Sequence, residues 1–182
     1  IGRDGNGDFY ATETQQRGVH FIPLHDPTLP TGVANTFNSE GSQRTFATYL
    51  GAAALLEAEQ LGCVMPDEVD YVFIAGYLVQ NHRLIEHAVE LSHQRGAKVC
   101  LDLASWNIVE SEHAFFERLL PHIDIVFANE DEARAMTGKI GKEAAHILAG
   151  PCHTAVVKCG PRGAFAVQGE HCVCEPATEV AH

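Results

Sequence analysis

Short apolar runs and amphipathic stretches alternate along most of the chain from residue 71 onward. Nearly continuous apolar runs are typical of strands covered on both faces of a parallel sheet. Between them, apolar residues recur at helical spacing, most clearly in residues 81–95, which end at Gly96. The pattern predicts strands at 71–75, 98–103, 123–128 and 154–158, helices at 81–95, 112–120, 129–137 and 142–149, and a final antiparallel pair at 164–168 and 172–175. Such repeated units indicate an α/β protein with a mostly parallel sheet and helices on both of its faces.

The first 50 residues follow a different pattern. A turn-rich start leads into a helix through Gln16, which Gly18 ends, and the alternation in residues 19–24 predicts a strand. Residues 33–38 and 44–49 predict two more strands, joined through a glycine-containing loop into a hairpin. Two interpretations of this hairpin, at residues 31–50, stay open: an edge hairpin, or a lid over a polar ligand.

Composition narrows the possible partners and the location. The 182 residues carry 24 acidic and 12 basic side chains, a net charge of −12. Nucleic acid or an anionic membrane would require a basic patch, so neither is expected as a partner. The longest apolar runs are strand-sized, and no charged and apolar leader is visible at the start. The six scattered cysteines favour reduced thiols, so we expect a cytoplasmic protein.

The most informative stretch is residues 123–138, an apolar strand that runs into a helix with almost no loop. Asn129 is a favourable N-cap, Glu132 lies at the third helical position, and Gly138 follows the last turn. In one interpretation Asn129 and Glu132 form a capping box that only satisfies backbone donors. In the other, acidic groups at a strand end beside a helix N-terminus hold hydrated Mg²⁺ and a phosphate.

Other polar positions follow the neighbouring strands. In open parallel sheets, ligands bind beyond the carboxyl ends of the strands. Those ends carry Tyr77, Asp102 and the turn Gly160-Pro-Arg-Gly163. The glycines of this turn allow a ligand to approach the backbone, and Arg162 is a candidate for phosphate binding.

Four segments together resemble a known family. They are Ile1-Gly-Arg-Asp-Gly-Asn-Gly-Asp8, Thr31-Gly32, Asn129-Glu-Asp-Glu132 and Val156-Val-Lys-Cys-Gly-Pro-Arg-Gly163, in this order. So arranged, they resemble the ribokinase-like, or PfkB, family of carbohydrate and nucleoside kinases. Residues 46–52 and 76–80 are similar to the adenosine kinase-like branch of that family.

The resemblance implies a three-layer α/β/α sheet with a small β lid, formed here by the hairpin at 31–50. It implies transfer of the γ-phosphoryl group of ATP, with Mg²⁺, to a hydroxymethyl group of a sugar or nucleoside. It also implies a possible homodimer through the lid. By position, the resemblance assigns Asn129 and Glu132 to Mg²⁺ and the phosphates, Lys158, Gly160 and Gly163 to the nucleotide, and Asn35, Thr48 and Tyr77 to the substrate.

One part of the family pattern is missing from the chain. The family's Gly-Ala-Gly-Asp motif, which carries the catalytic base, is expected after a segment like residues 175–182 and does not occur. We therefore expect residues 1–182 to be a single PfkB-type kinase domain that is incomplete at both termini and inactive by itself. The alternative is a non-catalytic α/β module that binds a nucleotide or metabolite.

Overall fold

The computed structural model describes residues 1–38 and 44–178, and the loop expected at 39–42 lies outside the described residues. These residues divide into two compact units, Ile1–Val64 and Met65–His182. In chain order the elements are α1 (Gly5–Gln16), β1 (Thr31–Asn38), β2 (Arg44–Gly51), η1 (Ala52–Leu55), α2 (Ala58–Val64), β3 (Tyr71–Ala75), η2 (Gly76–Leu78), α3 (His82–Gln94), β4 (Lys98–Asp102), α4 (Trp106–Ser111), α5 (His113–Leu119), η3 (Leu120–His122), β5 (Ile125–Asn129), α6 (Glu130–Thr137), α7 (Gly141–Leu148), β6 (Thr154–Lys158), η4 (Gly160–Arg162), β7 (Ala164–Gln168) and β8 (His171–Glu175).

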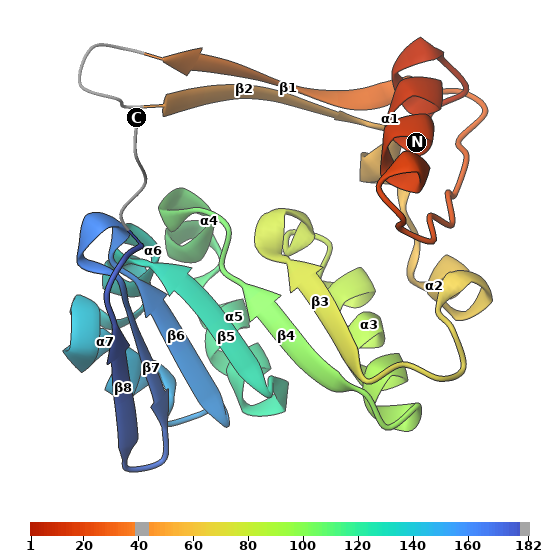
Figure 1. Ribbon diagram of the computed structural model, residues 1–182. Helices are drawn as coiled ribbons and strands as arrows, with labels where there is room; N and C mark the ends of the chain where they lie inside the picture. The colour runs from red at the N-terminus through yellow and green to blue at the C-terminus, as the bar shows by residue number, and fades with distance from the viewer. Residues whose placement is uncertain (39–43, 179–182) are drawn as a thin grey trace. The chain divides into compact units, whose positions relative to one another are not determined.

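The second unit is built on one six-stranded sheet, with the strands in the order β3-β4-β5-β6-β7-β8 (Figure 1). The first four strands are parallel, and β7 and β8 continue the sheet as antiparallel neighbours. Consecutive parallel strands are connected through helices, because the chain must cross back before the next strand can run in the same direction. The predicted mostly parallel α/β architecture is therefore confirmed.

The core of this unit lies between the sheet and the helices behind it in Figure 1, namely α3, α5 and α7. Alternate strand residues such as Leu101 and Val126 face this layer and are fully buried. From the helices, Phe116 and Leu148 are buried as completely. Burying a large apolar side chain stabilises the fold by about 1.5–3 kcal/mol, so this face dominates the stability of the unit.

The opposite face of the sheet is open in the described residues. Tyr71 and Phe73 point to this face and remain 56% and 61% exposed. Phe127 on β5 extends the same face, and its ring lies 6.2 Å from that of Phe73. The described part of the second unit therefore shows a sheet and one helical layer, while the sequence pattern predicted helices on both faces.

The first unit is organised around the side chain of Asp4, the N-cap of α1. Its carboxylate accepts hydrogen bonds from the backbone N–H of Gly7 at 2.8 Å and of Thr31 at 2.6 Å. The hydroxyl of Thr31 donates to Asp4 at 2.8 Å and accepts from the N–H of Gly2. One carboxylate thus ties the start of the chain to the start of β1.

The hairpin β1–β2 is a two-stranded antiparallel sheet within the first unit. In its register Ala34 opposes Thr48, while Asn35 opposes Ala47. Directly opposed residues share a face, and neighbours along a strand do not. Asn35 and Thr48 therefore lie on opposite faces of the hairpin, so only one of them can contact a ligand placed against a single face.

Three elements differ from the sequence prediction: the strand at 19–24 is absent, and helices α2 and α4 were not predicted. Residues 19–24 form no strand, because no neighbouring strand pairs with them; Phe21 instead packs edge-on against Tyr10, at 5.4 Å between ring centroids. Helix α4 was missed because it is only six residues long, too short for its periodicity to stand out. In the part of the chain that the structure describes, no helix is long and apolar enough to cross a membrane.

We expect Asp4→Asn to destabilise the first unit at pH 7 but not at low pH. Hydrogen bonds from Gly7 and Thr31 lower the pKa of Asp4 below its usual value of 3.8. An acid whose pKa is lowered on folding stabilises the folded state above its unfolded pKa, and this is lost as the pH falls through the folded pKa. Urea unfolding of both proteins in a pH series from 7 to well below 3.8 measures the difference, which should disappear only as the pH falls through the lowered pKa of folded Asp4. Asp8→Asn, in the same helix, is the matched control, and an equal effect of the two substitutions at pH 7 contradicts this role of Asp4.

Candidate functional site: the β5–α6 junction and its neighbours

Strand β5 passes directly into helix α6 through a complete capping box. Asn129 accepts a hydrogen bond from the Glu132 N–H at 2.9 Å, and Glu132 accepts one from the Asn129 N–H at 2.7 Å. The side-chain amide of Asn129 also donates to the second carboxylate oxygen of Glu132, at 2.6 Å. Gly138 then ends the helix in the left-handed conformation, with φ of 72°. The local structure predicted for residues 129–138 is confirmed.

Glu132 is a buried carboxylate, with only 2% of the residue exposed. Burial raises its pKa and the negative charge of Asp102 adds to this rise, while the hydrogen bond from Asn129 and the positive charge of Lys158 oppose it. The ionised side chain is therefore held at an electrostatic cost, which a bound cation would relieve. Among the described residues, Glu132 is the only charged residue that is buried.

Asp102 and Lys158 form an ion pair at the same rim of the sheet. They lie at the carboxyl ends of β4 and β6, and Lys158 Nζ donates to Asp102 at 2.7 Å across β5. The second oxygen of Asp102 accepts from the N–H of Ala104 at 2.9 Å. Sequence reasoning placed both residues at this rim but did not predict the pair, because its members are separated by 56 residues.

Ala104 has an unusual backbone conformation beside this pair. Its φ of 67° makes it the one non-glycine residue with positive φ in the described chain. An alanine in the left-handed region is disfavoured sterically and persists only where its surroundings hold it. Here the side chain of Asp102 accepts the hydrogen bond from the Ala104 N–H and stabilises this conformation. The same side chain pairs with Lys158.

The glycine turn after β6 is closed by its own backbone hydrogen bonds. Cys159 donates to Gly163 at 2.7 Å, and Gly163 donates to Gly160 at 3.0 Å. Both glycines have positive φ, 56° and 88°. A Cβ atom on Gly163 would lie 1.9 Å from the carbonyl oxygen of Glu175, so only glycine fits there.

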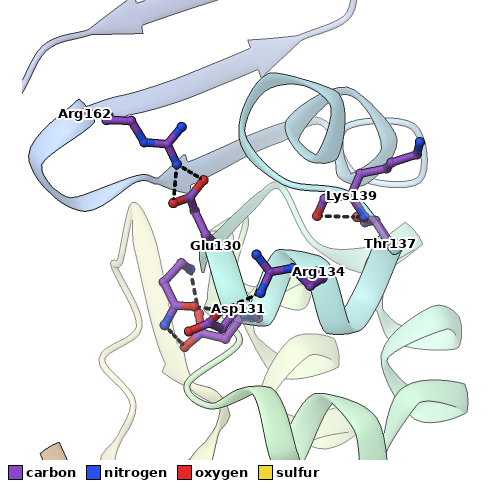
Figure 2. A network of polar contacts seen from close by, with 8 residues as sticks. Glu130, Asp131, Arg134, Thr137, Lys139 and Arg162 are labelled. Carbon is purple, nitrogen blue, oxygen red and sulfur yellow. Dashed lines mark hydrogen bonds and ion pairs between the residues drawn. The ribbon is translucent and has the colours of Figure 1, made fainter. Parts of the chain in front are cut away.

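Arg162, in this turn, is bonded to an acidic residue (Figure 2). Its Nη2 donates to both carboxylate oxygens of Glu130, at 2.5 and 2.6 Å. Glu130 is the first residue of α6, and neither its partner nor its role was predicted from the sequence. The charge of Arg162 is therefore already paired in this structure, and its binding of phosphate stays a prediction.

The remaining candidates lie in different places. Tyr77 follows β3 in η2 and is 56% exposed, at the same carboxyl end of the sheet as Asp102. Asn35 and Thr48 belong to the first unit, on the hairpin described above. The structure thus brings together Asn129, Glu132 and Lys158 with Asp102 at one rim.

These side chains fit a metal ion only in part. Within the described residues, no group of three or more His, Cys, Asp or Glu side chains is placed to hold a metal ion. Mg²⁺ is usually bound through one or two carboxylates, several waters and the phosphates of a substrate. Glu132 and Asp102 are carboxylates of this kind, and the oxygens of Glu132 keep lone pairs beyond those used in the capping box. The donor set therefore fits a hydrated Mg²⁺ shared with phosphates, and does not fit an ion held by protein alone.

Comparison with known proteins decides the family. Residues 1–181 match the family described as pfkB family carbohydrate kinase. The chain belongs to this family. The resemblance drawn from the four sequence segments is therefore confirmed.

Relatives of the chain include adenosine kinases. The one from Dictyostelium discoideum is 26% identical over 146 residues, which cover 77% of this chain and 42% of that protein. The one from Schizophyllum commune is 34% identical over 116 residues, 60% of this chain and 33% of that protein. The chain thus spans less than half the length of these relatives.

Solved structures support the same fold. A probable sugar kinase from Rhizobium etli CFN 42 superimposes with a TM-score of 0.91 at 25% identity, covering 99% of this chain and 57% of that one. An adenosine kinase from Sinorhizobium meliloti has a TM-score of 0.90 at 26% identity, covering 100% and 58%. The fold is therefore ribokinase-like.

We expect Asn129→Ala to cost more stability than loss of an ordinary N-cap. Asn81, the N-cap of α3, is the comparison, since its side chain accepts the capping hydrogen bond from the N–H of Leu84. Losing an N-cap costs about 0.5–2 kcal/mol. Asn129→Ala also removes the hydrogen bond to the buried Glu132 carboxylate, so its total is about 2–4 kcal/mol.

Urea unfolding at pH 7 of the wild type, Asn129→Ala and Asn81→Ala gives the three free energies. Equal losses in the two variants would show that Asn129 acts as a cap alone.

Proposed function

We propose that this chain is part of an ATP-dependent kinase that phosphorylates a hydroxymethyl group of a sugar or nucleoside, with the rim of β4, β5 and β6 binding Mg·ATP. The observation that carries the proposal is the buried Glu132, whose ionised form is penalised by burial and by Asp102. A divalent cation at this rim would offset both penalties. Membership of the pfkB family supports the reaction class, and the adenosine kinase relatives support a small-molecule acceptor.

In this proposal each residue has a limited task. Mg²⁺, when bound, neutralises charge that develops on the transferring phosphate. Asn129 holds the Glu132 carboxylate in a fixed orientation, and Lys158 is held by Asp102 at the rim where the nucleotide phosphates would lie. Gly160 and Gly163 let the nucleotide approach the turn backbone. Phosphoryl transfer depends mainly on such positioning and charge neutralisation.

A second candidate function has its own support. Both carboxylate oxygens of Glu132 are already engaged by Asn129. A residue so fully used in a capping box suits a purely structural role, in which the chain is a module that binds a nucleotide or metabolite without catalysis. The two candidates differ in whether Glu132 affects the binding of Mg²⁺.

We expect Mg·ATP to raise the thermal stability of the wild-type chain and to lose most of this effect in Glu132→Gln. Glutamine can still accept the capping hydrogen bond from the Asn129 N–H and removes the negative charge, but it loses the second contact, with the Asn129 side-chain amide. The Mg²⁺ effect is therefore compared within each variant, with and without the ion. A ligand present at 100 times its Kd stabilises by about 2.7 kcal/mol. Thermal unfolding with ATP, with and without Mg²⁺, measures the effect. Glu143→Gln, an exposed residue of α7, is the control, and an unchanged Mg²⁺ effect in Glu132→Gln supports the non-catalytic module.

Turnover is proposed for the longer protein and not for residues 1–182. The catalytic base of the family belongs to a Gly-Ala-Gly-Asp motif that this sequence does not contain. Reading the coding sequence beyond His182 tests the proposal directly. A frame that continues into the motif is expected, and the encoded protein is then assayed with ribose, fructose and adenosine. A frame that ends or continues without the motif overturns the kinase proposal.

The free cysteines of the described chain support a cytoplasmic location for this protein.

We further propose that the hairpin mediates a homodimer. One face of the hairpin carries Val33, Phe37 and Tyr49, which are 39%, 58% and 53% exposed. Exposed apolar surface of this kind on an open two-stranded sheet is typical of an interaction surface.

We expect Phe37→Ser with Tyr49→Ser to shift the protein from dimer to monomer in sedimentation equilibrium. Phe46→Ser, on the opposite face of the hairpin, is the control. A wild-type protein that is monomeric at micromolar concentration contradicts the dimer.

A further inference from the structure

The Glu130–Arg162 ion pair joins the two parts of the proposed Mg·ATP site. Glu130 begins helix α6, two residues before Glu132, and Arg162 lies in the glycine turn, between Gly160 and Gly163. The two residues are 32 positions apart, and Figure 2 shows the guanidinium of Arg162 against the carboxylate of Glu130. The side chain of Glu130 is 24% exposed and that of Arg162 is 64% exposed.

The charge of Glu130 also acts on the buried thiol of Cys159 at the start of the turn. Burial raises the pKa of Cys159, and the charge of Glu130 raises it further, while the charge of Arg162 opposes the rise. The Sγ of Cys159 itself donates to the carbonyl oxygen of Val157 at 3.6 Å, so the ion pair of Arg162 is the contact that attaches the turn to Glu130. The turn's other closing contacts, among the described residues, are backbone hydrogen bonds within the turn itself and do not reach α6.

The charge of Arg162 is balanced before any nucleotide binds. The hydrogen bonds that Arg162 donates to Glu130, and the negative charge of Glu130, raise the pKa of Arg162, so the guanidinium stays protonated and paired. The contact uses Nη2 of Arg162 and both carboxylate oxygens of Glu130. Charge-assisted contacts of this kind are stronger than neutral ones, so a phosphate near Arg162 would compete with a carboxylate that is already in place.

We propose that Glu130 and Arg162 are positioning residues that couple the glycine turn to helix α6, so that the nucleotide and Mg²⁺ bind as one unit. This inference rests on the proposed function of the rim. In it, Arg162 does not contact the phosphates. The pair fixes the place of the turn, against which the nucleotide lies, relative to the helix that carries Glu132. Loss of either partner weakens the dependence of ATP binding on Mg²⁺.

The test is a double-substitution cycle with Glu130→Gln, Arg162→Gln and both together. Isothermal titration calorimetry with ATP, with and without Mg²⁺, gives the factor by which Mg²⁺ tightens ATP binding. We expect each single substitution to reduce that factor about two- to tenfold, and the double substitution to reduce it no further. Arg162→Lys retains a positive charge near Glu130, so we expect it to restore part of the loss.

Glu143→Gln is the matched control for the cycle. Glu143 lies on α7, where it is exposed and pairs with Lys139 at 3.5 Å. We expect it to leave the Mg²⁺ dependence unchanged. Circular dichroism of each variant checks that it is folded. A purely structural role of the pair would lower the thermal stability of the variants and leave unchanged the factor by which Mg²⁺ tightens ATP binding.

Four other results overturn the inference. A large loss in Arg162→Gln with unchanged or tighter binding in Glu130→Gln would show that Arg162 contacts phosphate directly. Single effects that add in the double variant would show that the two residues act independently. A wild-type chain that binds ATP without any Mg²⁺ dependence would overturn the proposed function of the rim as well, whereas wild-type dependence with insensitive variants overturns only the coupling.

Discussion

The described site depends on one buried carboxylate at the point where β5 becomes α6. Glu132 forms the capping box with Asn129. The residue is only 2% exposed, and the negative charge of Asp102 acts on it. Its hydrogen bonds stabilise the start of the helix, and its burial makes the same group electrostatically costly. The structural role and the proposed affinity for cations therefore involve one side chain, and neither excludes the other.

Around this carboxylate, the rim is arranged by pairs of charges from distant parts of the sequence. Lys158 is held by Asp102, and Arg162 is held by Glu130. Each pair joins the carboxyl ends of strands, or the segments that follow them, which a parallel sheet places along one edge. The backbone of this rim is unusual at two positions. Ala104 has a positive φ beside Asp102, and the absence of a Cβ atom at Gly163 allows the carbonyl oxygen of Glu175 to approach closely.

The two compact units use acidic side chains in a similar way. In the first unit, the carboxylate of Asp4 accepts hydrogen bonds from backbone N–H groups at the start of α1 and of β1. The side chains of Glu132 and Asn129 accept such hydrogen bonds at the start of α6. Both arrangements satisfy N–H groups that the start of a helix leaves without partners. The family motifs at residues 1–8, 31–32 and 129–132 are in this sense structural motifs first, and the proposed chemistry is built on them.

Local features could be predicted from the sequence alone. The strand–helix order, the Asn129–Glu132 capping box and the glycine turn depend on residues within a few positions of one another, where propensity and capping chemistry decide. The resemblance to the pfkB family rested on the same short segments. Where a local pattern required a distant partner, as in residues 19–24, the sequence was misleading, because alternation alone does not supply a neighbouring strand.

Only the tertiary structure decided which charges meet. Asp102 pairs with Lys158 and Glu130 with Arg162 because the sheet brings strand ends together across 56 and 32 residues. The same holds for the opposite faces of Asn35 and Thr48, which follow from the register of the hairpin. The sequence therefore determined which side chains stand at the rim, and folding determined their partners, since pairing depends on distances in space that sequence spacing does not encode.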